Sequence, residues 1–589
     1  MHGSVSDMST LIKFMDRKEK LLITASVLLV ILQVRLEVQV PDQMKVMSRL
    51  LQEQEGDRRG LINSGMTMIA CAVLALMVSV GVGYIIARVA TELEIRLRDA
   101  AFTKVMDYSL EEVAGIGSAS LISRCTSDVQ VVGEFINHSY QQAIKAPITV
   151  IIVLYKIIGA DYRWILADVA AAILISLLLY GVFSRILPKV PLQQKQRDIM
   201  TQYSREHING MRVIHAYNGF SHQHKRMLAQ ADRVLDLDLF YYRRYALVHP
   251  GATAILNGLS LAIYAMGASI ITAAAPEARA GLYADMLAYL SLGTLLVSSF
   301  IYMASVLTNF PRARVSINRI MEVIDQDVSI TDGKGAAPLN EDAPAVEFSH
   351  VSFRYPGGKG MALTDISFRV NKGETLALIG ATGCGKTSVL NLIPRLFDAA
   401  EGEVYVNGVN VKDYKLNELR NILGYVPQKS YLFTRTIARN IGYGNNGRFC
   451  ATLEHIREAA RVGQADEFIR MKEGEYECEV ATGGSNFSGG QKQRLTISRA
   501  IARDPSIYLF DDSFSALDFK TDRVLRKELR ETAGDATMIV VAQRISTIRG
   551  ADRIIVLDEG RIVGEGTHAE LMKECEVYRE IAASQNAEE

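Results

Sequence analysis

Residues 375–387 read TLALIGATGCGKT, a short apolar run followed by a glycine-rich loop that ends in lysine and threonine. A GxxxxGK[ST] pattern between a strand and a helix is typical of a phosphate-binding loop. Its glycines let backbone N–H groups curl around phosphate oxygens, and the start of the following helix adds a partial positive charge. We expect Lys386 to contact the β- and γ-phosphates of a nucleoside triphosphate and Thr387 to ligate Mg²⁺. The nucleotide-binding residues predicted in this loop are Gly380, Thr382, Gly383, Cys384, Gly385, Lys386, Thr387 and Ser388.

Two segments downstream argue against the alternative of a plain glycine-rich turn. Residues 507–511 read IYLFD, an apolar run that ends in a carboxylate. This run predicts a buried parallel strand that delivers Asp511 to the metal edge of the nucleotide. Before it, residues 486–491 read NFSGGQ. This string resembles the LSGGQ signature of the ATP-binding cassette (ABC) family, with Phe487 in the leucine position. A phosphate-binding loop alone fits many NTPases, whereas the loop and the signature in this order are highly specific.

The resemblance covers essentially the whole chain, because the part before the cassette looks like the membrane half of an ABC exporter of the type IV fold. It implies an α-helical transmembrane domain with six spans, followed by an α/β P-loop nucleotide-binding domain. The implied boundaries are 1–325 for the transmembrane domain with an elbow helix and coupling-helix extensions, 326–344 for a linker, and 345–589 for the nucleotide-binding domain. The implied cofactors are ATP and Mg²⁺.

Further single positions match residues with roles in the family. Tyr355 matches the aromatic residue that stacks on adenine, and Gln428 matches the Q-loop glutamine that links Mg²⁺ and water to the membrane domain. Residues 515–518 read SALD and match the D-loop. Taken singly, each could be a core aromatic or a solvated polar residue, and their joint order favours the functional role. The signature residues that the resemblance assigns to nucleotide contact are Ser488, Gly489, Gly490 and Gln491.

Two positions depart from the family's catalytic pattern. The family's general base is a glutamate directly after the metal-binding aspartate, and this chain has Asp512 there. Removing one methylene withdraws the carboxylate by ~1.5 Å, and a general base must lie within hydrogen-bond reach of its water. The family's switch histidine falls at Gln543, whose amide cannot carry a positive charge or accept a proton as histidine does. Asp512, Gln543 and Gln428 are therefore the residues assigned to catalysis, and hydrolysis at this site is expected to be slow or absent.

The departures bear on assembly, because cassettes of this family act as head-to-tail pairs. Each nucleotide lies between the phosphate loop of one chain and the signature of the other. A self-pair would carry Asp512 and Gln543 in both of its sites. A complete, non-identical partner would leave only one site impaired, and Ser488, Gly489 and Gly490 would then complete the partner's competent site. The expected partner is therefore a second, non-identical ABC half-transporter in a heterodimer.

The first half of the chain contains long apolar runs. The 589 residues carry a formal net charge of zero, so the composition shows no nucleic-acid footprint. Four runs reach the ~20 residues needed to cross a bilayer, and a soluble core cannot absorb four such segments. They are 60–87, 164–184, 247–276 and 286–311. Two weaker spans are predicted at 21–34 and 146–160.

Six spans place both termini on one side of the membrane, and the need for ATP makes that side the cytoplasm. The predicted location is thus the cell (inner or plasma) membrane, with multiple passes and both termini cytoplasmic. Residues 8–20 are predicted to form an interfacial elbow helix. Four charged residues lie near predicted span ends, where their side chains are expected to snorkel to the interface. These are Arg35, Glu37, Lys156 and Asp168.

Segments 88–140 and 185–246 are too long for turns, and they carry helical patterning. They predict two long helical hairpins in the cytosol. Their tips, near 109–123 and 208–217, match the coupling helices that dock on the cassettes. A solvated linker is the alternative, and the length and periodicity argue against it.

These features predict a subunit of an ATP-driven membrane transporter that works by alternating access. In enzymatic terms it is an ABC-type ATP hydrolase coupled to transport. Multidrug export of lipophilic or amphipathic compounds is the leading expectation because it is frequent in the family. Transport of lipid, peptide or siderophore, including import by an exporter-like fold, remains open, as does a non-transporting regulatory subunit. The expected partners are the second half-transporter, the lipid bilayer and a small amphipathic substrate, with no nucleic acid.

Overall fold

The computed structural model describes residues 11–52, 58–158, 162–335, 342–444 and 451–586. The chain divides into two compact units. The first comprises Met1–Met106 and Ala119–Gln326, and the second comprises Asp107–Ser118 and Asp327–Glu589. Residues 8–10 of the predicted elbow helix and 336–341 of the predicted linker lie outside the described residues.

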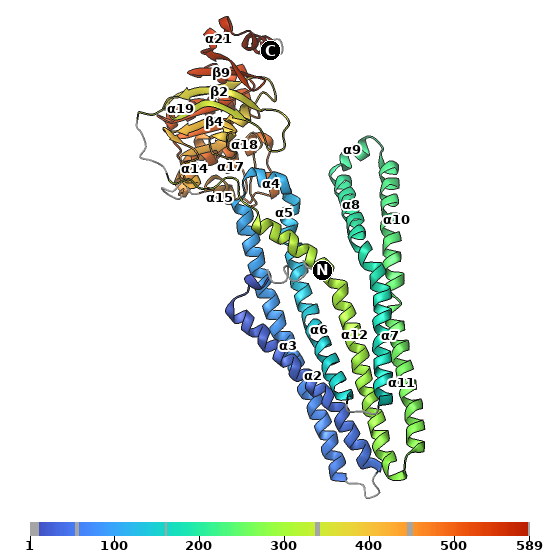
Figure 1. The fold of residues 1–589 in the computed structure, drawn as a ribbon. Coiled ribbons are helices and arrows are strands. Elements are labelled where there is room, and N and C mark those ends of the chain that lie inside the picture. Colours follow the sequence, from blue (N-terminus) through green and yellow to red (C-terminus); the bar gives the residue numbers. More distant parts are fainter. Residues whose placement is uncertain (1–10, 53–57, 159–161, 336–341, 445–450, 587–589) are drawn as a thin grey trace. The chain divides into compact units, whose positions relative to one another are not determined.

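The described residues of the first unit form helices and the turns that join them (Figure 1). Its helices are α2 (Arg17–Gln52), α3 (Arg58–Asp107), α5 (Ser118–Cys125), α6 (Ser127–Ile157), α7 (Tyr162–Ile186), η1 (Leu187–Lys189), α8 (Val190–Asn209), α9 (Met211–Ala216), α10 (Phe220–Tyr245), α11 (Val248–Ala273) and α12 (Pro276–Asp325). The long helix α12 packs along α6, α11 and α2, and α11 also packs against α7. The core of this unit therefore runs between long helices.

Five helical stretches are long and apolar enough to cross a membrane. They are Arg17–Leu51, Arg58–Asp107, Tyr162–Asn209, Phe220–Ala273 and Ala278–Asp325. Four of them contain a predicted span, and the stretch Phe220–Ala273 covers the predicted span 247–276 up to residue 273. The sixth prediction, at 146–160, falls on α6, which is not among the five stretches found in the described residues. The two lysines of α6, Lys145 and Lys156, lower its apolar character.

Helix α2 supplies an anion for each of these lysines. Lys145 Nζ lies 2.7 Å from Glu37 Oε1, and Lys156 Nζ pairs with Asp42. Because a charge inside a helical bundle is costly without a partner, these pairs let α6 pack against α2 with its lysines in place. Glu37 and Lys156 each form an ion pair with a residue of the neighbouring helix, whereas the sequence predicted that their side chains snorkel to the interface.

The prediction that Asp168 snorkels is wrong. Its side chain is fully buried in α7, with 0% of its surface exposed. Asp168 lies less than two turns inside the helix, and the packing of α11 and α12 against α7 covers it. Asp168 is buried because its side chain lies on the face of α7 that packs against α11 and α12. Its position near the end of the span did not determine its environment.

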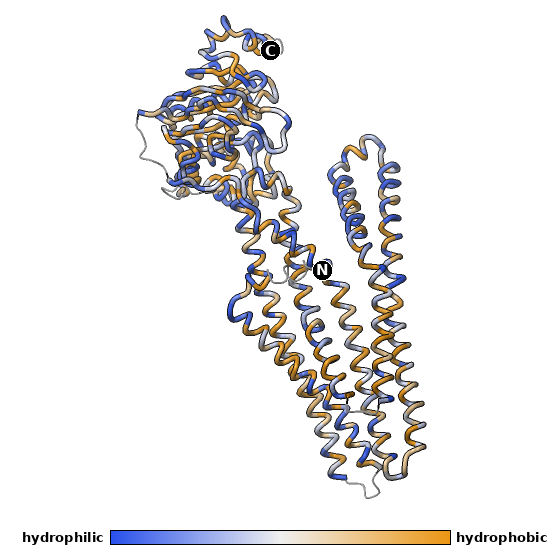
Figure 2. Tube along the Cα trace, viewed as in Figure 1, coloured by the Kyte–Doolittle hydropathy of each residue, from blue (hydrophilic) through white to orange (hydrophobic). Residues whose placement is uncertain are grey.

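Large apolar side chains cover much of the outside of the helical unit. Ile69 is 66% exposed, Leu76 is 64% exposed and Leu177 is 61% exposed. Such a surface is unfavourable in water, whereas lipid tails solvate it. Figure 2 shows hydrophobic residues concentrated along α7 and α11, and more hydrophilic residues in α8 and α10. This distribution fits a membrane-spanning unit with polar extensions.

The extension formed by α8, α9 and α10 is a helical hairpin joined by polar contacts. Arg197 Nη2 donates to Asp238 Oδ1 at 2.9 Å, and Gln230 Nε2 donates to the Gln196 carbonyl at 2.9 Å. The short helix α9 forms its tip, inside the predicted 208–217. The other predicted tip contains α4 (Leu110–Ile116) and the start of α5. Docking of either tip on a cassette stays a prediction.

The second unit contains two sheets. Its strands are β1 (Val346–Phe353), β2 (Leu363–Val370), β3 (Thr375–Ile379), β4 (Glu401–Val406), β5 (Val409–Asn410), β6 (Leu423–Val426), β7 (Ile507–Asp511), β8 (Thr537–Val541), β9 (Arg553–Asp558) and β10 (Arg561–Gly566). The smaller sheet is antiparallel, with order β2-β1-β4-β5. The larger has order β10-β9-β3-β8-β7-β6, parallel except for the edge strand β10. Strands β3, β7 and β8 are mostly apolar, as expected for strands buried on both faces at the centre of a parallel sheet.

Helices pack around these sheets. They are α13 (Lys386–Leu392), α14 (Leu416–Asn421), α15 (Ile437–Ile441), α16 (Leu453–Val462), α17 (Asp466–Arg470), η2 (Glu475–Glu477), η3 (Thr482–Gly484), α18 (Gly489–Ile501), α19 (Phe519–Ala533), α20 (Ile545–Ile548), α21 (His568–Glu574) and α22 (Glu576–Asn586). One hydrophobic core joins the two sheets around Phe348 and Leu509, and another lies beneath α19 around Leu525. A separate core around Leu432 and Phe487 holds α15, α16 and α17 together.

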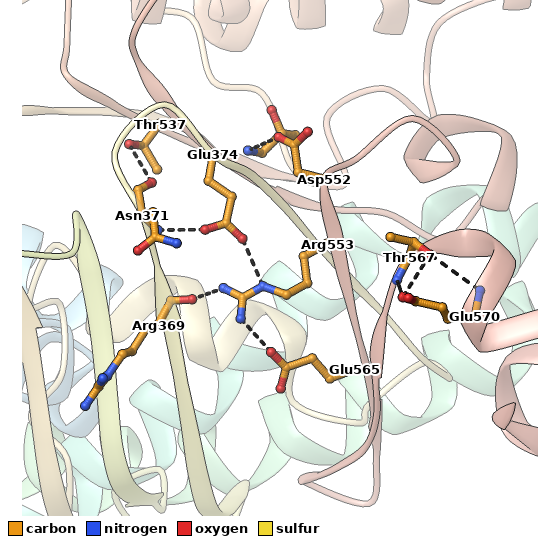
Figure 3. A network of polar contacts seen from close by, with 10 residues as sticks. Arg369, Asn371, Glu374, Thr537, Asp552, Arg553, Glu565, Thr567 and Glu570 are labelled. Atoms are coloured by element: carbon orange, nitrogen blue, oxygen red, sulfur yellow. Dashed lines mark hydrogen bonds and ion pairs between the residues drawn. The ribbon is translucent and has the colours of Figure 1, made fainter.

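Arg553 on β9 links the two sheets (Figure 3). Its Nε donates to Glu374 Oε1 at 2.9 Å, its Nη1 donates to Glu565 Oε1 at 2.6 Å, and its Nη2 donates to the Arg369 carbonyl on β2. Glu374 Oε2 also accepts the Asn371 N–H at 2.7 Å. The planar guanidinium thus joins β9, β10, β2 and the turn before β3, which a single ammonium could not do.

The second unit also includes α4, which lies far earlier in the sequence. Glu112 of α4 is buried, and its Oε1 accepts the Ser329 N–H at 2.9 Å. Its Oε2 accepts the Ser109 N–H at 2.7 Å, completing a capping box with the Ser109 side chain. One carboxylate therefore both caps α4 and holds the segment that leads into the cassette.

Candidate functional site

The predicted catalytic residues gather at one edge of the larger sheet. Strands β3, β8, β7 and β6 are parallel neighbours, so their carboxyl ends meet at this edge. Ligands of open α/β sheets bind outside the carboxyl ends of the strands. The residues that follow these ends are Gly380 after β3, Gln543 after β8, Asp512 after β7 and Gln428 after β6.

The phosphate-binding loop has the predicted strand–loop–helix setting between β3 and α13. Gly385 caps α13 with φ of 102°, in the left-handed region that side chains avoid. A Cβ there would also lie 2.7 Å from the Ala362 carbonyl oxygen. Lys386 is buried, and its Nζ donates to the carbonyls of Gly380 and Ala381 at 2.7 and 2.8 Å. The loop thus closes around the lysine ammonium that is predicted to meet phosphate.

Thr387 and Asp511 form an oxygen-rich corner beside the loop. Thr387 Oγ1 donates to Asp511 Oδ1 at 3.0 Å. Burial raises the pKa of the Asp511 carboxyl; the Thr387 hydrogen bond lowers it, and the charge of Asp512 raises it further. A hydroxyl and a carboxylate are the hard oxygen ligands that Mg²⁺ takes in nucleotide sites. These two residues fit the metal-binding role assigned to them.

Asp512 and Gln543 contact each other directly. Gln543 Nε2 donates to Asp512 Oδ2 at 2.8 Å. The Asp512 backbone holds the side chain in this place, because its N–H donates to Val541 O at 3.0 Å and its φ of 47° is unusual for a residue other than glycine. Burial raises the pKa of Asp512, and hydrogen bonds from Ser515 and Gln428 lower it. Burial alone would strengthen this base, but the Gln543 amide occupies one of its oxygens.

Gln585 of α22 is a residue that sequence reasoning missed. Its Nε2 donates to the Gln543 carbonyl at 2.6 Å, and its Oε1 accepts the Ile545 N–H at 2.8 Å. The C-terminal helix thus clamps the segment that carries Gln543. No motif in the sequence marks Gln585, since the contact joins residues far apart along the chain.

Tyr355 lies against the same loop. Its hydroxyl is 3.0 Å from Ser388 Oγ, and its ring makes edge contacts with Phe353 and Phe397 at centroid distances of 4.7 and 5.2 Å. The ring is only partly buried. The remaining exposed surface leaves room for the predicted stacking on adenine.

The signature begins helix α18, in the part of the unit that has its own core. Phe487 is buried there beside Phe468, with ring centroids 6.4 Å apart. Ser488 caps α18: its Oγ accepts the Gln491 N–H at 3.3 Å, and Gln491 Oε1 accepts the Ser488 N–H at 3.1 Å. Ser488 and Gly489 are exposed. The structure therefore gathers the loop, Gln428, Asp511, Asp512 and Gln543 at one sheet edge and anchors the signature in a different core.

Comparison with known families matches both units. The model described as the ABC transporter transmembrane region matches residues 23–300, and the model described as ABC transporter matches residues 363–515. Among solved structures, the chain resembles a bacterial Atm1-family ABC exporter with ATP bound. The TM-score is 0.82 at 22% identity, covering 97% of this chain and 99% of that chain. At this identity the likeness establishes the fold.

Curated relatives extend along most of the chain. An uncharacterised ABC transporter ATP-binding protein of Mycobacterium tuberculosis is 34% identical over 538 residues, 90% of each chain. The ATP-dependent lipid A-core flippase of Pseudomonas aeruginosa is 30% identical over 500 residues, 85% of this chain and 81% of the flippase. With both units matched by family models and relatives aligned along nine-tenths of its length, the chain belongs to the ABC transporter family as an exporter-fold half-transporter, a helical transmembrane region followed by an ABC ATPase domain.

Proposed function

We propose that this half-transporter binds ATP at a site of its own that hydrolyses slowly, and that it works with a second, non-identical half-transporter that supplies the main hydrolytic site. The observation that carries the proposal is the 2.8 Å hydrogen bond from Gln543 Nε2 to Asp512 Oδ2. Asp512, in the general-base position, is one methylene shorter than the family's glutamate, and one of its carboxylate oxygens already accepts the Gln543 hydrogen bond. A base in that state activates water poorly.

The same site keeps the groups that hold a nucleotide. Lys386 would meet the phosphates, while Thr387, Asp511 and Gln428 would hold Mg²⁺. The metal supplies charge neutralisation to the phosphates when bound. Tyr355 would contribute a ring face to adenine. Binding without fast hydrolysis is thus the expected property of this site.

The signature supports a role in a neighbouring site. Ser488 and Gly489 are exposed at the start of a 13-residue helix, where backbone N–H groups and the helix dipole favour an anion. A nucleotide held by a second chain's phosphate loop would meet this surface in a head-to-tail pair. Its donors would then stabilise charge that develops on the partner's γ-phosphate during hydrolysis.

The proposed substrates are lipophilic or amphipathic compounds. Support comes from the names of two relatives: the lipid A-core flippase, and a Bacillus subtilis protein named as a candidate multidrug export ATP-binding/permease protein, 31% identical over 496 residues, 83% of each chain. We place the protein in the cell membrane with both termini in the cytoplasm, since the cassette requires ATP. The hairpin tips at α4 and α9 would couple cassette closure to alternating access.

The test compares the chain alone with the chain in complex. Purified in lipid nanodiscs, the chain alone should bind ATP with Mg²⁺ and turn over slowly. Adding the correct half-transporter should produce fast ATP hydrolysis and substrate movement across vesicles. Fast turnover by a verified homodimer would overturn the two-chain proposal. Substrate-independent ATPase without flux would instead indicate a regulatory subunit.

A further inference from the structure

Asp168 is the clearest electrostatic anomaly of the helical unit. It is 0% exposed, and neither carboxylate oxygen has a hydrogen-bond partner among the described residues. Its immediate neighbour is the backbone of α12. A Cβ built on Gly293 would lie 2.7 Å from Asp168 Oδ1 and 2.8 Å from Leu259 Cδ2. The carboxylate therefore lies in a tight seam between α7, α11 and α12, whose described residues donate no hydrogen bond to it.

Other acids of this unit are treated differently. Asp285 on α12 pairs with Lys45 and lies 3.5 Å from Arg49 Nη2. Glu37 pairs with Lys145. Taking a carboxylate out of water without a partner is costly, and a fold normally avoids it or uses it. Among the described buried acids of this unit, Asp168 is the one for which both carboxylate oxygens lack a hydrogen-bond partner.

The surroundings of Asp168 are aromatic and adaptable. Trp164 lies four residues earlier on α7, hence on the same helix face, and its indole stacks on Tyr289 with ring centroids 6.0 Å apart. Met286 lies next to the indole, since a Cβ on Gly267 would contact Met286 Sδ and Trp164 together. Aromatic faces attract cations, tryptophan most strongly, and the thioether adapts to varied shapes.

We propose that Asp168, with Trp164 and Tyr289, forms the recognition site for an organic cation, an ammonium or related group on an apolar body. The Asp168 carboxylate compensates the positive charge, and the faces of the aromatic rings contact the cationic group. The apolar side chains of the seam contact the apolar body of the ligand. The site opens when α12 separates from α7 at Gly293, so the packed seam is its closed state. The assignment to transported substrates rests on the proposed transport function.

The experiment reads the site through Trp164, the single tryptophan of the chain. The chain is purified in amphipol and titrated with benzyltrimethylammonium, and in parallel with neopentylbenzene, its neutral isostere. The wild type should show saturable quenching by the cation and markedly weaker quenching by the isostere. Asp168→Asn should weaken cation affinity by about thirtyfold or more, while Asp168→Glu retains most of it.

The matched control is Asp238→Asn in the α8–α10 hairpin, which removes an acid that Arg197 already pairs with. It should leave cation affinity unchanged. No saturable quenching in the wild type, equal quenching by the neutral isostere, or unchanged affinity in Asp168→Asn would overturn the proposal. The tryptophan emission maximum and a monodisperse elution profile establish that each variant is folded. Because binding is read without ATP turnover or a second chain, failure here is distinguishable from failure of the proposed two-chain mechanism.

Discussion

The side-chain amide of Gln543 donates a hydrogen bond of 2.8 Å to Asp512 Oδ2, so the two departures from the family's catalytic pattern form one polar unit. They are brought together because β7 and β8 are parallel neighbours, with Asp511 opposite Val541. A histidine in place of Gln543 would present a ring to the phosphate, and a glutamate in place of Asp512 would reach further. The two substitutions therefore act together on one step.

Restoring both residues should activate hydrolysis more than the sum of the single changes. Asp512→Glu extends the carboxylate by one methylene but leaves the Gln543 amide beside it. Gln543→His removes that amide but leaves the shorter side chain of Asp512 as the base. In the two-chain complex, with the partner's catalytic glutamate changed to glutamine, the double variant should hydrolyse ATP on the order of 10²-fold faster than wild type in the same background, the lower range for a positioned base. Steady-state phosphate release measures this.

The control for this cycle is Asp535→Glu, which adds the same methylene to an exposed acid away from the site. It should leave turnover unchanged. If wild type already matches the double variant, the site is not impaired and the proposal fails.

Substitution of the signature should damage the complex more than substitution of the loop lysine. Ser488→Arg puts a bulky cation at the start of α18, where donors would meet the partner's nucleotide, and turnover should fall about 10²-fold or more. Lys386→Ala weakens binding at the slow site, so hydrolysis should fall but remain measurable. ATPase of the two-chain complex at saturating ATP gives the ranking.

Ser485→Arg is the matched control, since Ser485 is an exposed serine three residues before the signature serine. It should retain near-normal turnover. The reverse ranking, with Lys386→Ala worse than Ser488→Arg, would show that the two sites have been assigned the wrong way round.

Glu112 should make stability depend on pH. Burial raises the pKa of this carboxyl, but hydrogen bonds with Ser109 and Ser329 outweigh burial and hold it below its ordinary value of 4.5. A carboxyl whose pKa is lower in the folded state stabilises the fold above the unfolded-state pKa, and that stabilisation is lost as pH falls through the folded-state value. Glu112→Gln should therefore lower the free energy of unfolding by about 1.5–3 kcal/mol at neutral pH.

Unfolding of the full chain, followed from pH 7 to acid, checks this expectation. The difference in free energy of unfolding between wild type and Glu112→Gln should become smaller below pH ~4.5. Glu111→Gln, at the exposed neighbouring position, should show no such difference. A difference that stays constant with pH would mean that the charge of Glu112 is irrelevant.

Arg553→Lys should destabilise the cassette although the charge is kept. The Arg553 guanidinium donates hydrogen bonds to Glu374, Glu565 and the Arg369 carbonyl, and the Arg553 side chain is 26% exposed. An ammonium cannot reach all three, so we expect a loss of about 1–3 kcal/mol in denaturant unfolding. Arg523→Lys, at an exposed position on α19, should be neutral. Equal stability of the two variants would refute the linking role of Arg553.

The sequence alone determined the features that are local along the chain. The phosphate loop and signature are contiguous strings, and four apolar runs needed only their length to predict spans. The identities of Asp512 and Gln543 could likewise be read by position after their strands. These features can be predicted from the sequence because each depends only on neighbours within one element.

Tertiary structure decided what depends on neighbours far apart in sequence. The bond between Gln543 and Asp512, the clamp by Gln585 and the hold of Glu112 on Ser329 arise from strand order and helix packing. The same holds for Asp168, predicted at the interface and found buried, because a span shows which residues are apolar but not which face meets another helix. Burial and pairing depend on contacts between residues that are far apart in the sequence, and only the tertiary structure decides which residues make these contacts.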